Sequence, residues 1–507
     1  MSRTGSTPAT TVAIIGTGFG GLGMAYYLKQ AGIESFTLFE KAQEIGGTWR
    51  ENTYPGSGCD VPSHLYSFSF EPHYPWAWRY ARQAQILDYM RHCADKHDLR
   101  RHIRLGCEVT GAEFDASRGL WSLQLADGQR HEATFLVSAV GQLHRPAYPK
   151  LAGLERFQGK AFHSAQWDHA HDLAGKTVAV IGTGASAVQF VPEIAQQARQ
   201  LHVFQRSPGW TLPKAEREFS AFERRVLDRL PFLHDLDRAR IYGMTELLAY
   251  AYRGHRWAEG AITALARSHL NRQVRDPELR RKLTPDHPVG CKRILLSNTW
   301  LPTLARPNVE VVTDAVTEIT TNGIRSADGR VREVDTLIFG TGFAATDFLA
   351  PMQIRGLEGR KLRETWRHGA EAYLGLAVSG FPNFFMLYGP NTNVGSGSVI
   401  HMLECQQRYV TQMVRARAEN GWSHVDVDAQ AQATFNREVR TRSQQSTFEG
   451  NCQSWYKTAD GRNTNNWIGS MREYTRRTAR PVTEHFHFSD RVTSPMPTPV
   501  AVAIPQT

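Results

Sequence analysis

The sequence predicts an α/β fold with two Rossmann-like dinucleotide-binding domains, the second of which carries a helical insertion. Three observations lead to this fold class. A strand, a glycine-rich turn and a helix occur near Gly16, and the same pattern recurs near Gly182. Each pattern is followed by a second strand that ends in a charged residue, 24 positions after the first glycine. Between about residues 216 and 286, the α/β alternation gives way to Leu, Arg, Glu and Ala at helical spacing.

The first pattern lies in TVAIIGTGFGGLGMAYYLKQAG. Residues 11–15 predict a buried parallel strand, and Gly16, Gly18 and Gly21 follow it in GxGxxG spacing. In such a motif the first glycine permits the tight turn, the second lets the backbone approach a pyrophosphate, and the third lets helix pack on strand. The next strand, FTLFE, ends at Glu40, where a carboxylate can bind ribose hydroxyls. We therefore predict a dinucleotide site here.

The second pattern, KTVAVIGTGASAVQF, has a strand over residues 177–181, and the following strand, LHVFQR, ends at Arg206. Arg206 therefore occupies the position that Glu40 has in the first half. A carboxylate suits two free ribose hydroxyls, whereas an arginine suits a 2′-phosphate. We predict FAD in the first site and NADPH, rather than NADH, in the second; the alternative is that Arg206 is a solvated strand-end arginine. The turn of the second site comprises Gly182, Thr183, Gly184, Ala185, Ser186 and Ala187.

These motifs divide the chain. The first part of the FAD-binding domain is expected over residues 1–148, the NADP-binding domain with its insertion over 149–375, and the second part of the FAD-binding domain over 376–507. The apolar stretches at 134–141 and 335–342 are expected to return the chain to each sheet. The apolar residues of the insertion are interpreted as packing, with shaping of substrate access as the alternative.

Composition limits the classes of function. The net charge is +10, but no helix-turn-helix, finger or RNA-binding signature is visible, so no nucleic-acid partner is expected. No apolar run approaches the ~18 residues of a membrane span, so no membrane partner is expected either. The six cysteines are scattered without CxxC or metal-ligand spacing, which predicts reduced thiols and no metal. The N-terminus has no signal-like stretch, and we expect a cytoplasmic protein that is a monomer or a weak homo-oligomer.

Two further segments carry a family resemblance. FQGKAFHSAQWD (157–168) matches the pattern FxGxxxHxxxW(P/D), and GGTWRENTYPGSGCD (46–60) matches [A/G]GxWxxxx(F/Y)PGxxxD at every fixed position. Both patterns are typical of type I Baeyer–Villiger monooxygenases, which are class B flavoprotein monooxygenases, and the resemblance spans about residues 11–470. His163 resembles a structural and hinge element of that family rather than a general base.

The resemblance implies a reaction in which ketone, O₂ and NADPH give ester or lactone, water and NADP⁺. In the family this proceeds through a C4a-peroxyflavin and a Criegee intermediate. One alternative is a related flavin-containing enzyme that oxygenates sulfur or nitrogen. A flavoprotein that senses redox state or binds a partner without turnover is the alternative from another class.

The segment PVGCKRILLSN (288–298) resembles the part of the family that holds its catalytic arginine, which would be Arg293. A permanently charged guanidinium stabilises an anionic peroxide and the oxyanion that follows. By resemblance Asp60 is its counter-charge, and Lys292 reaches the 2′-phosphate beside Arg206. The alternatives are an ordinary salt bridge for Arg293 and a helix cap or surface acid for Asp60.

Other cofactor contacts are implied in the same way, because Thr48, Trp49 and Tyr66 resemble residues that lie against the cofactor. Gln142, just after the strand 134–141, is expected to border the flavin, with a structural use of this strand as the alternative. Trp467, in RNTNNWIGSM, resembles a tryptophan on a mobile control loop that contacts NADP, with core packing as the alternative. The last residues, SPMPTPVAVAIPQT, are typical of a proline-rich tail.

Overall fold

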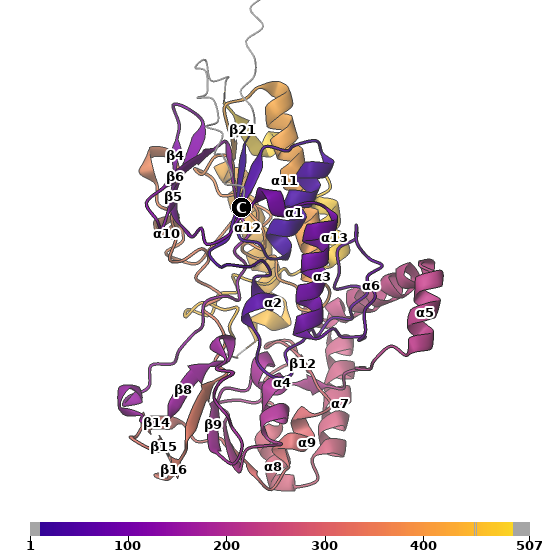
Figure 1. Cartoon of the computed structure of the whole chain (residues 1–507), viewed down its shortest axis with the longest axis vertical. Helices are drawn as coiled ribbons and strands as arrows, with labels where there is room; N and C mark the ends of the chain where they lie inside the picture. Colours follow the sequence, from indigo (N-terminus) through magenta and orange to yellow (C-terminus); the bar gives the residue numbers. More distant parts are fainter. Residues whose placement is uncertain (1–10, 451, 453, 490–507) are drawn as a thin grey trace, which may run out of the picture.

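The first sheet brings together strands from distant parts of the chain (Figure 1). A computed structural model describes residues 11–450, 452 and 454–489, so the predicted tail lies outside the described residues. The strand order of this first sheet is β19-β7-β1-β2-β3, and every neighbouring pair of strands is parallel. The strands are β1 (Val12–Ile15), β2 (Phe36–Phe39), β3 (Ile103–Arg104), β7 (Phe135–Ser138) and β19 (Phe384–Met386). We call this sheet and its helices the first unit.

The helices of the first unit cover the sheet because its strands are apolar on both faces. Helix α1 (Phe19–Gln30) packs against the long α11 (Val399–Asn420), and α3 (Gln83–Lys96) packs on α1. All four residues of β1 and of β7 are buried. Short α2 (Thr48–Glu51), α12 (Ala429–Gln444) and α13 (Met471–Arg477) complete this part of the chain.

The second sheet repeats this arrangement in the lower half of Figure 1. Its order is β13-β10-β9-β17-β8, again with all pairs parallel. The strands are β8 (Lys160–His163), β9 (Thr177–Ile181), β10 (Gln200–Phe204), β13 (Val309–Val312) and β17 (Thr336–Phe339). With α4 (Ala185–Ile194) and α9 (Trp300–Leu304) they form the second unit. The predicted α/β fold with two Rossmann-like units is confirmed.

Smaller sheets flank the two units. Three are antiparallel or mixed, and one is a parallel strand pair near the cavity described below. They comprise β4 (Val109–Asp115), β5 (Leu120–Leu125), β6 (Arg130–Ala133) and β18 (Gln353–Arg355); β14 (Val316–Ile319), β15 (Gly323–Ser326) and β16 (Val331–Glu333); β20 (Val425–Val427) and β21 (Phe486–Phe488); and β11 (Thr211–Leu212) and β12 (Leu295–Leu296), with α10 (Leu362–Thr365) beside β18.

The helical insertion lies between β11 and β12. It consists of α5 (Ala221–Arg229), α6 (Phe232–Tyr252), α7 (Arg256–Gln273) and α8 (Pro277–Leu283). A capping box of Ser220 and Glu223 begins α5, and Asp276 caps α8. Figure 1 shows α5 and the adjoining end of α6 at the side of the molecule, away from both large sheets.

The expectation of six reduced thiols is wrong for two of them. Cys291 and Cys452 form a disulfide, with Cα atoms 6.2 Å apart and a sequence separation of 161. Cys59, Cys93, Cys107 and Cys405 are free. The pairing depends on the fold bringing two distant segments together, and neither the CxxC test nor metal-ligand spacing reports such an approach.

The described residues provide neither a membrane-spanning helix nor a cluster of metal ligands. None of their helices is both long and apolar enough to cross a bilayer. No group of three or more His, Cys, Asp or Glu side chains among them is arranged to hold a metal ion.

Candidate active site

One cavity of about 1920 Å³ receives the carboxyl ends of β1 in the first unit and β9 in the second. Ligand sites in open α/β sheets lie at such strand ends. The volume exceeds the roughly 300–1000 Å³ of common small-molecule pockets and suits two dinucleotides with a substrate. Most of the predicted residues line it, namely Gly16, Gly18, Glu40, Thr48, Trp49, Asp60, Tyr66, Gln142, Gly182, Thr183, Gly184, Ala185, Ser186, Arg206, Lys292 and Arg293.

Each unit presents a helix N-terminus to the cavity. Gly18 is the N-cap of α1 and Gly184 is the N-cap of α4, and no side chain caps either helix. A Cβ added at either glycine would have no protein atom within 4 Å, so both positions open onto empty space. Uncapped amides that face an open cavity fit a pyrophosphate, which the helix dipole also favours. The residues present therefore fit FAD in the first unit and a second dinucleotide in the other.

Gly16 and Gly182 begin these turns with φ values of 102° and 106°, a left-handed conformation that side chains rarely adopt. Gly21 and Ala187, in contrast, do not line the cavity. A Cβ at Gly21 would collide with the carbonyl oxygen of Gly16, and Ala187 is fully buried in the core of the second unit. Both positions serve close packing of helix on strand.

The two strand-end residues differ in their surroundings. Glu40 is 5% exposed, and one carboxylate oxygen accepts hydrogen bonds from the Thr17 amide (3.1 Å) and hydroxyl (2.7 Å). The other oxygen accepts from the Ala42 amide at 3.0 Å and pairs with Arg50 at 3.1 Å. Arg206 is exposed on the cavity wall. The carboxylate is thus fixed by the protein, while the guanidinium faces open space.

Lys292 lies beside Arg206. Burial lowers the pKa of Lys292, and the positive charge of Arg206 lowers it further. The Lys292 ammonium donates a hydrogen bond to the hydroxyl of Ser207. Two neighbouring cations that repel each other form a site for a dianion such as a phosphate monoester.

The predicted flavin-side residues form two hydrogen-bonded groups. The Trp49 indole donates to the Tyr66 hydroxyl at 3.2 Å, and burial raises the pKa of Tyr66 well above its usual range. Gln142 donates to the Tyr388 carbonyl at 2.7 Å and accepts from the Asn465 side chain at 2.9 Å. The turn at 395–397 also lines the cavity just before α11 begins.

Arg293 lies on the cavity wall with its charge maintained. Burial alone would lower its pKa, but the negative charge of Asp60, followed by the Tyr252 and Tyr388 hydroxyls, raises the pKa above its usual value. Nevertheless, Asp60 is not within ion-pair distance of Arg293. Among the described residues the ion pair of Asp60 is with Lys214, at 3.7 Å between Oδ1 and Nζ. The structure thus places Asp60 between two cations.

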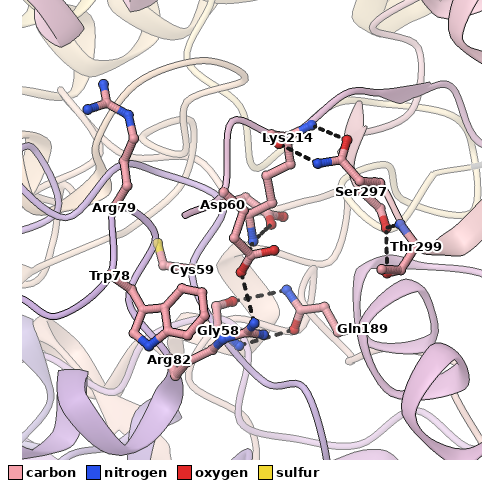
Figure 2. Close-up of polar contacts among 12 residues, drawn as sticks. Gly58, Cys59, Asp60, Trp78, Arg79, Arg82, Gln189, Lys214, Ser297 and Thr299 are labelled. Atoms are coloured by element: carbon pink, nitrogen blue, oxygen red, sulfur yellow. Dashed lines mark hydrogen bonds and ion pairs between the residues drawn. The ribbon is translucent and has the colours of Figure 1, made fainter. Parts of the chain in front are cut away.

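Sequence reasoning missed Lys214. Its side chain is only 8% exposed, and its Nζ lies 5.0 Å from the Tyr80 ring centroid. It also pairs with Glu216 at 3.7 Å, and Glu216 pairs with Arg82 at 3.2 Å (Figure 2). This chain of charges joins the Asp60 loop and Arg82 of the first unit to the segment after β11. No motif marks Lys214, because its importance comes from this approach of distant segments.

Gln189 on α4 was also missed. Its side-chain amide donates to the Gly58 carbonyl at 3.0 Å, and its oxygen accepts from the Gly58 amide at 3.3 Å (Figure 2). The same oxygen accepts from the Tyr54 hydroxyl at 3.0 Å. A helix of the second unit thereby holds the loop that carries Asp60.

Trp467 is placed in the core rather than on the cavity wall. It is 2% exposed, packs near Phe435 and Tyr474, and donates to the Ser470 carbonyl at 3.1 Å. The tryptophan of this part of the chain that lines the cavity is Trp455. A large apolar ring with one donor is satisfied in either position, so the local sequence does not distinguish them.

His163 ends β8 and is fully buried. Its Nδ1 accepts a hydrogen bond from the Ala165 amide at 3.1 Å, and burial lowers its pKa. It does not line the cavity.

The sequence also matches a known family model. Residues 9–233 match the model of the flavin-binding monooxygenase-like family. The chain is 45% identical over 469 residues to a Baeyer–Villiger monooxygenase of Pseudomonas aeruginosa, covering 91% of this chain and 89% of the relative. It is 43% identical over 471 residues to a Baeyer–Villiger monooxygenase of Streptomyces coelicolor, covering 92% and 91%.

Solved structures agree with these relatives. An oxidised steroid monooxygenase bound to NADP superposes with a TM-score of 0.84 at 30% identity, covering 94% of this chain and 99% of the other. A closed cyclohexanone monooxygenase gives 0.84 at 28% identity, covering 96% and 100%. A protein called OTEMO, in complex with FAD and NADP, gives 0.83 at 27% identity, with the same coverage.

Proposed function

The chain belongs to the Baeyer–Villiger monooxygenases, and we propose that oxygen insertion by this member depends on Arg293, with Asp60 as its counter-charge. The enzyme contains FAD, depends on NADPH and converts ketones to esters or lactones with O₂. The observation that supports the role of Arg293 is its position on the wall of a cavity that both dinucleotide turns share, near the negative charge of Asp60.

We propose that Gly16, Gly18, Glu40 and the Trp49–Tyr66 pair hold FAD, with Gln142 at its border. Bound FAD supplies the electrons, taken from NADPH, that activate O₂. The turn at 182–186, together with Arg206 and Lys292, would hold NADPH. The matching domain limits are 1–148, 149–375 and 376–507.

Arg293 would stabilise the negative charge that develops on the reacting oxygen atoms. Its guanidinium stays protonated at every working pH, so it acts by charge and hydrogen bonding rather than by proton transfer. Removing one preorganised donor of this kind typically costs about 10²–10³ in rate. Asp60 would offset the charges of Arg293 and Lys214 before substrate arrives, and Lys214 would hold its carboxylate in place.

The wall that the insertion contributes indicates the substrate class. Ile241, Met244 and Leu248 on α6 and Ile262 on α7 line the cavity with apolar side chains. We propose an apolar ketone, in keeping with the cyclohexanone and steroid monooxygenases that superpose on this chain. A monomer or weak homo-oligomer, the absence of a nucleic-acid partner and a cytoplasmic location remain proposals from the sequence.

The test is product analysis under ¹⁸O₂ with NADPH and a panel of cyclic, linear and aryl ketones and sulfides. Labelled ester or lactone is expected from the wild type. Arg293→Ala should lose about 10²–10³ of the rate, whereas Arg415→Ala, on the exposed side of α11, should not. Ester formation that survives in Arg293→Ala would contradict the proposed role, and labelled sulfoxide alone would favour the sulfur-oxygenating alternative.

A further inference from the structure

The helical insertion exposes an unusual concentration of apolar side chains. Among the described residues, fourteen large apolar side chains are exposed, and ten of them lie between residues 222 and 265. They are Phe222, Leu230, Phe232, Leu236, Met244, Leu247, Leu248, Tyr250, Trp257 and Leu265. We call this surface the apolar face. Single exposed apolar residues are ordinary, but a large contiguous set marks an interaction site.

Most of the apolar face follows one side of two helices, whereas Met244 and Leu248 lie toward the side of α6 that carries Ile241 and lines the cavity. Four exposed residues lie on one side of α6, because the spacings between them are close to whole helical turns. They are Phe232, Leu236, Leu247 and Tyr250. Ile241, on the other side of the helix, is buried.

Helix α7 has the same arrangement. Trp257, Ala261, Ala264 and Leu265 are exposed, and the other side of the helix buries Ile262. Helices α6 and α7 pack against each other, so the two exposed apolar sides lie on neighbouring helices of the insertion.

Cations surround this face. Six arginines between residues 222 and 267 are exposed, against two exposed aspartates, Asp228 and Asp235. The arginines are Arg224, Arg225, Arg229, Arg240, Arg256 and Arg267. Within the described part of the chain, only Arg240 of these six makes an ion pair, with Asp237 at 2.9 Å. The other five positive charges are available to a partner.

We propose that the apolar face docks on an anionic lipid surface. Helices that lie in a membrane interface combine an apolar side bearing Trp, Phe and Leu with flanking Arg or Lys that attract anionic headgroups. Phe222, Tyr250 and Trp257 supply the aromatic rings that favour the headgroup region. A second copy of this chain is the less suitable occupant, because a symmetric contact would bring the two arginine-rich surfaces together.

The apolar face is continuous with the cavity. Met244 and Leu248 are 53% and 40% exposed and also line the cavity, as does Arg240. A lipid-dissolved ketone would therefore reach the cavity past Met244 and Leu248, which α6 holds between its docking side and the cavity. This link to substrate delivery rests on the proposed apolar substrate, whereas the docking itself does not.

The proposal differs from the expectation of no membrane partner. That expectation came from searching for a spanning segment, and surface docking needs none. Leucine at helical spacing predicts a packed side, but the sequence alone does not say which side of α6 is covered.

The first experiment is cosedimentation of the full-length, FAD-loaded protein with vesicles. We expect binding to vesicles of phosphatidylcholine with phosphatidylglycerol, weaker binding to pure phosphatidylcholine, and release by high salt, because exposed charges are screened. Absence of binding to the anionic vesicles would overturn the proposal.

Variants locate the surface. F232S/L247S/W257S should weaken vesicle binding by about tenfold or more, because the apolar contribution scales with the inserted area. R224Q/R225Q/R229Q should reduce binding to anionic vesicles and its salt dependence. The matched controls L105S/V331S and R330Q/R415Q change exposed residues elsewhere and should bind like the wild type. Turnover of a small soluble ketone should be unchanged in all of them.

Other occupants have their own signatures. Sedimentation that shows a dimer dissociated by F232S/L247S/W257S would assign the apolar face to a second copy. Vesicle binding that appears only in V500S/V502S/I504S would assign it to the chain's own C-terminal segment. Binding that persists unchanged in F232S/L247S/W257S would place the lipid contact elsewhere. Each of these three results would overturn the proposal.

Discussion

The two Rossmann units share a strand order but differ in chemistry where their second strands end. In the first unit, Glu40 follows β2 and is buried with both carboxylate oxygens hydrogen-bonded. In the second unit, Arg206 follows β10 and faces the cavity. The same backbone therefore presents a fixed negative charge in one unit and a free positive charge in the other. We expect this one position to set which ribose substituent each unit suits.

The glycine-rich turns also differ, in the residue where helix packs on strand. The first unit has Gly21 in contact with the Gly16 carbonyl, whereas the second accommodates the methyl group of Ala187. The first turn is therefore the tighter one. We therefore expect the first unit to tolerate less change at this position than the second.

The largest expected effect comes from Gly21→Ala. The added Cβ would overlap the Gly16 carbonyl oxygen, and overpacking of this kind costs about 1–3 kcal/mol or more. We expect the purified variant to have lost most of its FAD, measured by flavin absorbance after gel filtration. Ala187→Gly, the reciprocal change in the second unit, should keep its FAD.

Because Gly21→Ala could disturb the whole first unit, Gly18→Ala is the companion variant. Its Cβ meets no protein atom and would occupy only the opening toward the cavity. It should unfold at the wild-type temperature as apoprotein and yet bind FAD more weakly. Full FAD content in both variants would remove the proposed difference between the turns.

Arg206→Ala should have the next largest effect. A hydrogen bond to a charged group contributes about 1.5–3 kcal/mol, so kcat/KM with NADPH should fall by roughly 10–150-fold. Turnover with NADH should change little, because NADH lacks the 2′-phosphate. Arg206→Lys should retain part of the preference. An equal loss with both coenzymes would mean that Arg206 acts on structure rather than on the phosphate.

The contact between the units can be measured through Lys214 and Asp60. Lys214→Met, Asp60→Asn and the double variant form a thermodynamic cycle, read by thermal unfolding of the FAD-loaded protein. Groups in one buried charge network couple by about 0.5–3 kcal/mol, and the 3.7 Å pair lies in such a network. The exposed pair Lys361–Glu364 provides the control cycle, with coupling below about 1 kcal/mol. Additive effects of Lys214→Met and Asp60→Asn would show that their pairing does not join the units.

The smallest effect concerns His144, which follows β7 and lines the cavity shared by the units. Burial, with the charges of Lys41 and Arg145, lowers the pKa of His144 to about 4. Histidine in the unfolded chain titrates near 6.5. Above about pH 6.5, His144 is neutral in both the folded and the unfolded chain, and its contribution to the free energy of unfolding is fully present. As the pH falls from about 6.5 toward about 4, His144 takes up a proton in the unfolded chain but not in the folded one, so the folded state loses this stability.

The melting temperature of His144→Gln should accordingly fall less than that of the wild type when the pH is lowered from about 7 to about 4.5. The exposed His368→Gln is the control and should follow the wild-type curve. A His144→Gln curve parallel to that of the wild type would contradict a lowered pKa at this position.

Local patterns were sufficient to predict the fold. Gly16 and Gly182 require left-handed backbone, and apolar strands beside them require burial, so both sheets follow from short segments. The positions of Glu40 and Arg206 on the cavity wall could be predicted for the same reason, because each residue lies 24 positions after the first glycine of its turn.

Residues defined by distant approaches could not be predicted in this way. Lys214 reaches Asp60, and Cys291 reaches Cys452, only after the chain has folded. The surroundings of Trp467 and the outward side of α6 are likewise set by which neighbours arrive. Sequence patterns indicate the periodicity of a segment and the chemistry of its residues, whereas these four features depend on how distant elements pack together.

The discontinuous first sheet has a consequence for how the protein is made. Its edge strand β19 leaves the ribosome about 250 residues after β7, the strand with which it pairs. The strands of the second sheet, in contrast, all lie between residues 160 and 339. At 5–20 residues per second, translation imposes a delay of roughly 12–50 s between these strands. The apolar edge of β7 and the side of α1 that α11 covers stay unpaired during that time. The nascent chain should therefore complete its second unit first, and the half that begins at the N-terminus is the last to close.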